Sequence, residues 1–201
     1  MDRVIILYPE AFNCYSKFHR KISKIIQNMD NYLVIYPDDY NGFIINFFKE
    51  NHPNIDVIQN YNWKNEEVTH GIVFDDGEEF IEETTFLKSL GIPLRVIRIL
   101  ITRVINVKKE VEFKTKKSTP FYEYIGRGSY WGNPYSMYDS TDDRDEVIRK
   151  YRYDFEFEKF ANKKKSEVYK LMGKRLGCFC KPEACHGDIL ADYLNSLDDG
   201  K

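Results

Sequence analysis

Short apolar runs alternate with segments of helical spacing along the first half of the chain. Five runs rich in β-branched and aromatic residues predict buried strands. They cover residues 3–8, 32–36, 55–58, 70–74 and 94–100. Apolar residues at every third or fourth position predict the intervening helices, at residues 15–29, 41–51 and 79–90. This alternation predicts an α/β fold with a mostly parallel, Rossmann-like sheet that carries helices on both faces.

The second half has a different order of elements. Strand-like runs cover residues 101–109 and 174–180, and helical spacing covers residues 142–160, the end of 162–172, and 187–197. The long helix carries Arg144, Arg149, Lys150 and Arg152, and we expect most of these charges to face solvent. We therefore predict two domains, a Rossmann-like domain at residues 1–101 and a smaller α+β domain at residues 102–201. No Gly/Ser linker separates them, so the halves are expected to pack together.

Composition narrows the class of protein. The 201 residues carry 30 Lys and Arg against 32 Asp and Glu, a formal net charge of −2 that gives no global basic field for nucleic acid. No apolar run approaches the ~20 residues of a membrane span, and the N-terminus has no signal-peptide pattern. The cysteines lack the spacing of a secreted disulfide framework. We therefore expect a cytoplasmic protein without a membrane partner, and the oligomeric state is left open.

The fourth predicted strand ends in an acidic turn at the sheet edge where parallel sheets bind ligands. Residues 1–100, with motifs at 70–77 (HGIVFDDG) and 91–97 (GIPLRVI), resemble the SLOG superfamily of Rossmann-like domains. That group includes nucleotide phosphoribohydrolases, in which a PGGxGT loop precedes a catalytic Glu. Residues 75–80 of this chain (DDGEEF) depart from that loop motif. The resemblance implies a ligand-binding role for Asp76 and Gly77. The alternative is a strand-end turn that caps the next helix.

A glycine-rich loop at residues 126–135 (GRGSYWGNPY) is the first candidate site of the second half. Glycines let the backbone approach a ligand closely, and Arg127 can hold a phosphate or carboxylate through paired N–H donors. Tyr130 and Trp131 offer ring faces for a nucleobase. The alternative is a hairpin loop in which Arg127 pairs with a core carboxylate.

Residues 173–188 (GKRLGCFCKPEACHGD) concentrate the cysteines of the chain. One interpretation is a metal site, since Cys178, Cys180, Cys185 and His186 supply four nitrogen and sulfur ligands of the kind that tetrahedral zinc prefers. A second is a reactive thiol or anion site, because Cys185 precedes a predicted helix whose N-terminus favours a thiolate, with His186 as proton shuttle. The third is a set of buried, inert cysteines.

The two blocks together carry a second resemblance. Residues 124–135 (YIGRGSYWGNPY) and 173–190 (GKRLGCFCKPEACHGDIL) resemble an uncharacterised family, the domain of unknown function 4326, over residues 101–197. The resemblance supplies no established activity. It implies that the glycine-rich loop and the cysteine-rich stretch form one pocket.

These patterns predict an enzyme that acts on a nucleotide or nucleotide-derived small molecule, by hydrolysis or transfer at a glycosidic or phosphate linkage. The predicted catalytic residues are Cys185, His186 and Asp188. The predicted ligand-binding residues of the second half are Gly126, Arg127, Ser129, Asn133, Lys174 and Cys180. The alternatives are a non-catalytic nucleotide sensor, a nucleic-acid-binding module in which Tyr130 and Trp131 stack on bases, and a structural zinc domain.

Overall fold

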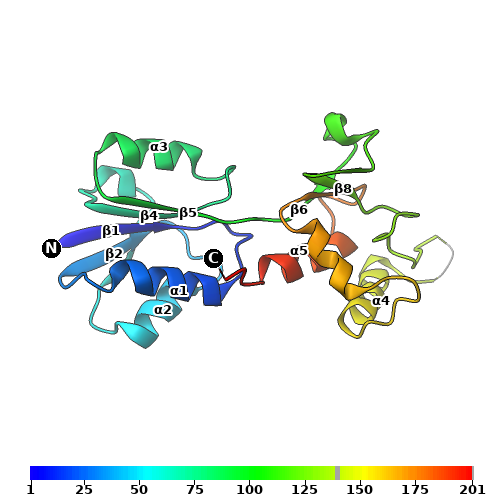
Figure 1. Ribbon diagram of the computed structural model, residues 1–201, viewed down its shortest axis with the longest axis horizontal. Coiled ribbons are helices and arrows are strands. Elements are labelled where there is room, and N and C mark those ends of the chain that lie inside the picture. Colours follow the sequence, from blue (N-terminus) through cyan, green and yellow to red (C-terminus); the bar gives the residue numbers. More distant parts are fainter. Residues whose placement is uncertain (139–140, 201) are drawn as a thin grey trace. The chain divides into compact units, whose positions relative to one another are not determined.

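The computed structural model describes residues 1–138 and 141–200, which fall into two units (Figure 1). One comprises Met1–Ile99 and the chain from Asp198 onward, and the other comprises Leu100–Leu197. The C-terminal segment belongs to the first unit, where the Lys17 ammonium lies 2.8 Å from the Asp199 carboxylate. The predicted second domain, residues 102–201, instead includes these last residues, and its final residue, Lys201, lies outside the described residues.

Five parallel strands form the sheet of the first unit, in the order β3-β2-β1-β4-β5. They are β1 (Asp2–Leu7), β2 (Tyr32–Tyr36), β3 (Val57–Gln59), β4 (His70–Asp75) and β5 (Leu94–Arg98). Every predicted strand of this half is present, and the predicted α/β class is confirmed. The three inner strands are buried because their β-branched runs are covered on both faces.

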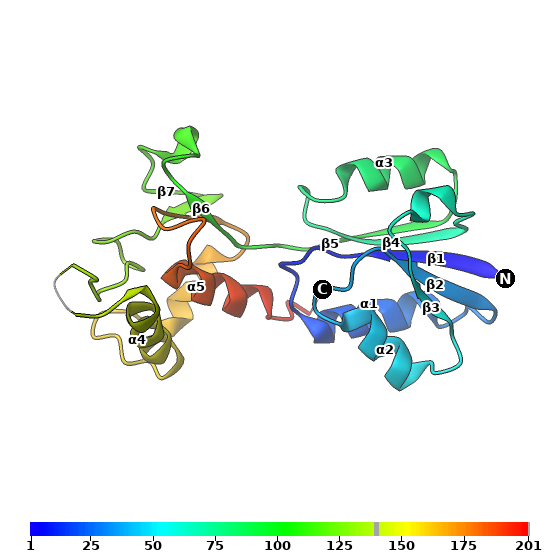
Figure 2. The same ribbon diagram turned by 180° about the vertical axis from the view of Figure 1, so that it is seen from behind.

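Helices cover both faces of this sheet. Helices α1 (Tyr15–Ile26) and α2 (Phe43–Asn51) lie on one face, and α3 (Ile81–Ser89) lies on the other (Figures 1 and 2). Phe18 of α1 is buried, and its ring stacks on that of Phe74, with centroids 5.3 Å apart. A short 3-10 helix spans Trp63–Asn65. The helical spacing read from the sequence thus marks the faces that pack on the sheet.

Four strands form a smaller mixed sheet in the second unit, in the order β6-β9-β8-β7. They are β6 (Arg103–Asn106), β7 (Ser118–Thr119), β8 (Tyr122–Tyr124) and β9 (Arg175–Cys178). The helices are α4 (Arg144–Glu156) and α5 (His186–Asn195), with 3-10 helices at Val111–Phe113 and Lys165–Leu171. Strand β9 pairs in parallel with β6 and β8, whereas β7 and β8 are antiparallel.

Strand β9 lies in the middle of this sheet and leads into the cysteine-rich turn. Its Gly177 faces the ring of Tyr122, and a Cβ at that position would lie 2.2 Å from the tyrosine oxygen. A side chain at position 177 would therefore displace the buried Tyr122 ring from its place over β9. Helix α4 packs Val147, Tyr151 and Phe155 into the core of the unit, as its apolar spacing predicts.

A buried amide fixes α5 against the start of β6. The Asn195 side chain accepts a hydrogen bond from the backbone N–H of Thr102 (2.8 Å) and donates one to its carbonyl (3.0 Å). Both residues are buried. The pair anchors the C-terminal end of the helix whose N-terminal end carries His186.

None of the described helices is both long and apolar enough to cross a membrane. The α-helix with the most residues, α4, has 13, which is well short of the ~20 residues that a span requires.

We expect Asn195→Ala to lower the free energy of unfolding by about 2–5 kcal/mol, because the N–H and C=O of Thr102 would both be left buried without partners. Urea denaturation followed by circular dichroism measures this difference. The matched control is Ser196→Ala, which removes an exposed hydroxyl that donates to the Tyr193 carbonyl and should change stability by about 0.5 kcal/mol or less. Equal effects of the two substitutions would contradict the anchoring role.

Candidate functional site

A cavity of about 340 Å³ lies in the second unit, bordered by the glycine-rich loop, the start of α4 and the turn after β9. Its lining residues are Gly126, Arg127, Asn133, Tyr135, Met137, Tyr138, Arg144, Val147, Ile148, Cys178, Phe179, Cys180, Ala184 and His186. This size is that of small-molecule sites, which lie at about 300–1,000 Å³. The loop and the cysteine-rich stretch thus contribute to one cavity.

Two guanidinium groups dominate the charge of the cavity. Arg127 donates a hydrogen bond to the Ser136 hydroxyl (2.9 Å), and its guanidinium carbon lies 6.0 Å from the centroid of the Tyr138 ring. Arg144 donates to the carbonyl of Ala184 (3.2 Å), the residue directly before Cys185, which caps the N-terminus of α5. Among the described lining residues there is no carboxylate. This charge balance favours an anionic ligand.

Four of the predicted ligand-binding residues line this cavity, namely Gly126, Arg127, Asn133 and Cys180. Asn133 also has a structural role, because its amide donates to the Val147 carbonyl (3.1 Å) and accepts from the Tyr135 N–H (2.9 Å). Ser129 and Lys174 are not among the lining residues. The Lys174 ammonium lies 3.2 Å from the Glu123 carboxylate.

The sequence did not identify the contribution of α4 to this site. Arg144 is partly exposed and lines the cavity together with Val147 and Ile148. The first turn of α4 lies beside the turn before α5, where the Arg144 guanidinium donates to the Ala184 carbonyl. Arg144 and Ala184 are 40 positions apart in the sequence, so a local pattern does not reveal their contact.

The stacking role of Trp131, predicted for the alternative of a nucleic-acid-binding module, is wrong. Its side chain is 4% exposed and belongs to the hydrophobic core of the unit. The Tyr130 ring packs edge-on against it, with centroids 5.1 Å apart. The carbonyl of Trp131 accepts a hydrogen bond from the buried Tyr151 hydroxyl (2.9 Å). A buried indole has no free face on which a nucleobase could stack.

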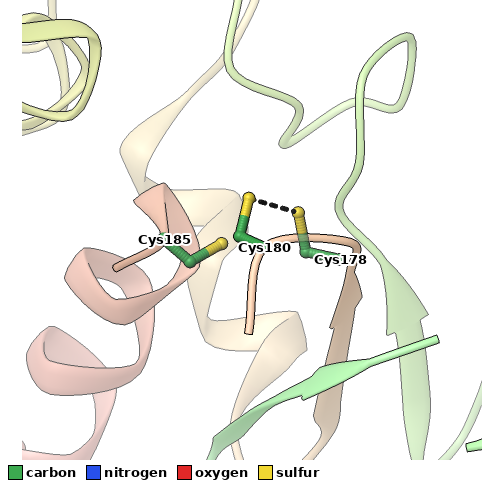
Figure 3. A group of neighbouring side chains, drawn as sticks. All are labelled: Cys178, Cys180 and Cys185. Carbon is green, nitrogen blue, oxygen red and sulfur yellow. Dashed lines mark hydrogen bonds between the residues drawn. The ribbon is translucent and has the colours of Figure 1, made fainter. Parts of the chain in front are cut away.

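Three cysteine thiols meet beside the cavity (Figure 3). The sulfur atoms of Cys178, Cys180 and Cys185 all lie within 4.8 Å of one another, and those of Cys178 and Cys180 are 3.4 Å apart. Cys178 and Cys180 come from the end of β9 and the turn after it, and Cys185 precedes α5 and directs its sulfur toward them (Figure 3). Cys178 and Cys185 are buried, whereas Cys180 is partly exposed. We call these three residues the thiol cluster.

Hydrogen bonds within the thiol cluster separate the pKa values of its members. The hydrogen bonds from Cys178 and Cys185 lower the pKa of the Cys180 thiol, because both stabilise its thiolate. The positive charge of Arg144 lowers that pKa as well. The hydrogen bond with Cys180 raises the pKa of Cys178, and those with Cys178 and Cys180 raise the pKa of Cys185, with burial adding to both. Of the three thiols, the least buried one, Cys180, is thus the one whose thiolate form is favoured.

His186 is held in one orientation. Its Nε2 lies 2.9 Å from the Ile125 carbonyl oxygen, which can only accept, so the proton is on Nε2 and Nδ1 carries the lone pair. The Nδ1 atom lies 3.7 Å from the Cys185 sulfur. Burial lowers the pKa of His186, so the ring is neutral at pH 7.

Cys185 and Asp188 form the N-terminal cap of α5. The Asp188 carboxylate accepts from the Cys185 backbone N–H (2.9 Å) and lies 2.7 Å from the Lys181 ammonium. The backbone N–H of Gly187 donates to the Cys185 sulfur (3.4 Å). Neither Cys185 nor Asp188 is among the cavity-lining residues, and their catalytic role stays a prediction.

The candidate residues of the first unit form the turn after β4. The Asp76 carboxylate accepts from the backbone N–H groups of Glu78 and Glu79, both at 3.0 Å. Gly77 has φ of +88°, and a Cβ there would lie 2.9 Å from the Arg98 guanidinium, so only glycine suits the turn. These contacts are those of a strand-end turn that precedes a helix, and a ligand-binding role of Asp76 and Gly77 stays a prediction.

Comparison with known proteins agrees with both resemblances read from the sequence. Residues 1–105 match the minimal SLOG domain, and residues 105–196 match a domain of unknown function (DUF4326). An uncharacterized 12.4 kDa protein encoded in the nrdA-td intergenic region of Enterobacteria phage T4 is 36% identical over 98 residues, which cover 48% of this chain and 89% of the phage protein. No solved structure matches the chain. The protein belongs to the minimal SLOG family through its first half, and its second half matches the domain of unknown function 4326.

Proposed function

We propose that the protein is an enzyme that acts on a nucleotide or nucleotide-derived small molecule in the cavity of its second unit. The observation that carries the proposal is a cavity of small-molecule size with two arginines and, among its described lining residues, no carboxylate. The SLOG match independently suggests a nucleotide-related function. The reaction we propose is hydrolysis or transfer at the glycosidic or phosphate linkage.

The cavity offers distinct surfaces for the two parts of such a molecule. Arg127 and Arg144 would hold the anionic group, because guanidinium groups bind phosphate through paired N–H donors. Tyr135, Val147 and Ile148 would contact the base or the sugar, since they line the same cavity with apolar surface. Tyr135 is held in place by a hydrogen bond from its hydroxyl to Asp154 (2.6 Å).

We further propose that the thiol cluster holds one zinc ion as cofactor. Zinc binds thiolates at about 2.3 Å, so three sulfurs around it lie about 3.8 Å apart. The spacing of the cluster is compatible with this geometry after small side-chain adjustments. The three cysteines of the cluster are free thiols, so each can supply a thiolate ligand to the ion.

His186 is then the proposed acid–base group, because it lines the cavity in its neutral form with the Nδ1 lone pair available. Cys185 would act as a zinc ligand rather than as a nucleophile. Asp188 would act as a positioning residue, since it holds the backbone N–H of Cys185 and closes the start of α5.

We expect nucleotides to raise the melting temperature of the protein and to be turned over, and Arg144→Ala to weaken binding about 10- to 100-fold through loss of a charged hydrogen bond. Thermal shift, calorimetric titration and chromatography of the products measure these effects over a panel of nucleotides and NAD-like compounds. The matched control is Arg149→Ala, on the same helix, because Arg149 is exposed, pairs with Glu146 and is absent from the cavity lining. If the protein binds nucleotides without converting them, the result supports a sensor instead. If it neither binds nor converts them, the proposed function is refuted.

We expect about one zinc ion per chain in protein purified without added metal. Replacing Cys178, Cys180 or Cys185 by serine should each reduce the zinc content to a small fraction, because three protein ligands are needed. Elemental analysis by mass spectrometry measures the content. The matched control is Cys14→Ser, which removes a buried cysteine of the first unit and should leave the zinc content unchanged. Full zinc content in the Cys180→Ser protein would contradict the assignment of ligands.

A further inference from the structure

The three sulfurs of the thiol cluster supply one ligand fewer than four-coordinate zinc requires. Structural zinc sites fill the fourth position with another protein side chain, whereas reactive sites leave it to water or to a ligand. The surroundings of the cluster therefore bear on which kind of site it is.

Two sides of the thiol cluster have different surroundings. Cys185, which is 1% exposed, and Cys178, which is 5% exposed, both lie among the core residues of the unit. Cys178 and Cys180 line the cavity, and Cys180 is partly exposed. An ion between the three sulfurs would thus have protein core behind Cys185 and the cavity beside Cys178 and Cys180.

His186 is the nearest side chain that could close the fourth position, and its contacts hold it aside. It does not belong to the group of ligand atoms that lie within 4.8 Å of one another. Its Nε2–H is bound to the Ile125 carbonyl (2.9 Å), and its ring packs edge-on against the buried Tyr151 ring, with centroids 4.9 Å apart. The Nδ1 atom lies 3.7 Å from the Cys185 sulfur but outside the group, so it would have to move toward Cys178 and Cys180 to join it. The packing of the ring against Tyr151 opposes that movement.

Arg144 places positive charge at the same side of the thiol cluster. It lines the cavity with Cys178 and Cys180, and its hydrogen bond to the Ala184 carbonyl holds it one residue before Cys185. An oxygen ligand on the metal would therefore lie within the field of a guanidinium group. A set of three cysteines is also a known ligand set of zinc that activates water in nucleobase deaminases.

We infer that the fourth coordination position of the metal opens into the cavity, where it holds water that an anion or a small thiol can replace. The inference rests on the proposed zinc site and deepens the proposed function, since it assigns the metal to the ligand-binding cavity. A metal site with such an open position is a reactive site rather than a structural one. The occupant belongs to one chemical class, a small anionic donor such as a phosphate oxygen or a thiolate.

The test uses the full-length protein with Co²⁺ in place of Zn²⁺, because the visible d–d bands of cobalt report its ligands. The probes are inorganic phosphate and 2-mercaptoethanol, neither of which requires the nucleotide proposal to be correct. We expect each probe to shift the bands with saturation. In Arg144→Ala the phosphate concentration at half effect should rise about tenfold, whereas Arg149→Ala should behave as the unchanged protein.

Each outcome decides one claim. Bands that neither probe alters would show a closed site and overturn the inference, while leaving the zinc proposal intact. No thiolate-to-cobalt charge-transfer band would mean that no metal binds, which refutes the zinc proposal itself. A normal response to both probes in a protein that neither binds nor converts nucleotides would support the open site and refute the proposed function.

Discussion

The turn between β9 and α5 is the constraint on which the candidate site depends. Strand β9 is paired on both sides, so the register with β6 fixes Cys178 opposite Asn106. The Asn106 amide then donates to the carbonyls of Phe179 (3.4 Å) and Lys181, which holds the backbone of the turn. Helix α5 begins at His186, so the turn places Cys185 beside the end of β9, where its sulfur lies near those of Cys178 and Cys180. The spacing of the three thiols follows from the pairing of the sheet.

The sequence predicts the elements well because their signals are local. The run 32–36 has the same bounds as β2, since an uninterrupted β-branched and aromatic segment between polar turns can only be a buried strand of this length. Helix ends are less accurate. The predicted helix 41–51 begins at Phe43, because Gly42 has φ of +69° and the Asp39 carboxylate accepts from the N–H groups of Ile44 and Ile45. Such a cap depends on the tertiary position of the aspartate.

The candidate site is less predictable, because residue type does not distinguish a ligand contact from a structural one. Trp131 has the type of a stacking platform but lies in the core, and Lys174 has the type of an anion ligand but pairs with Glu123. Arg144 shows the reverse, since its helical position indicates a solvated face and its tertiary position makes it part of the cavity. The cysteine-rich stretch is the exception, because its cysteines are close in sequence and the structure brings three of their sulfurs within 4.8 Å of one another.

The two arginines of the cavity have different electrostatic tasks if the thiol cluster holds zinc. Three thiolates around a divalent ion leave a net charge of −1, which would repel an arriving phosphate. Arg144, beside the cluster, offsets that charge, as its effect on the Cys180 thiolate already indicates. Arg127, on the glycine-rich loop, is then the cation that gives the cavity a net attraction for an anion. Because both arginines line one cavity, the loop and the cysteine-rich stretch together offer an arriving phosphate more positive charge than either would alone.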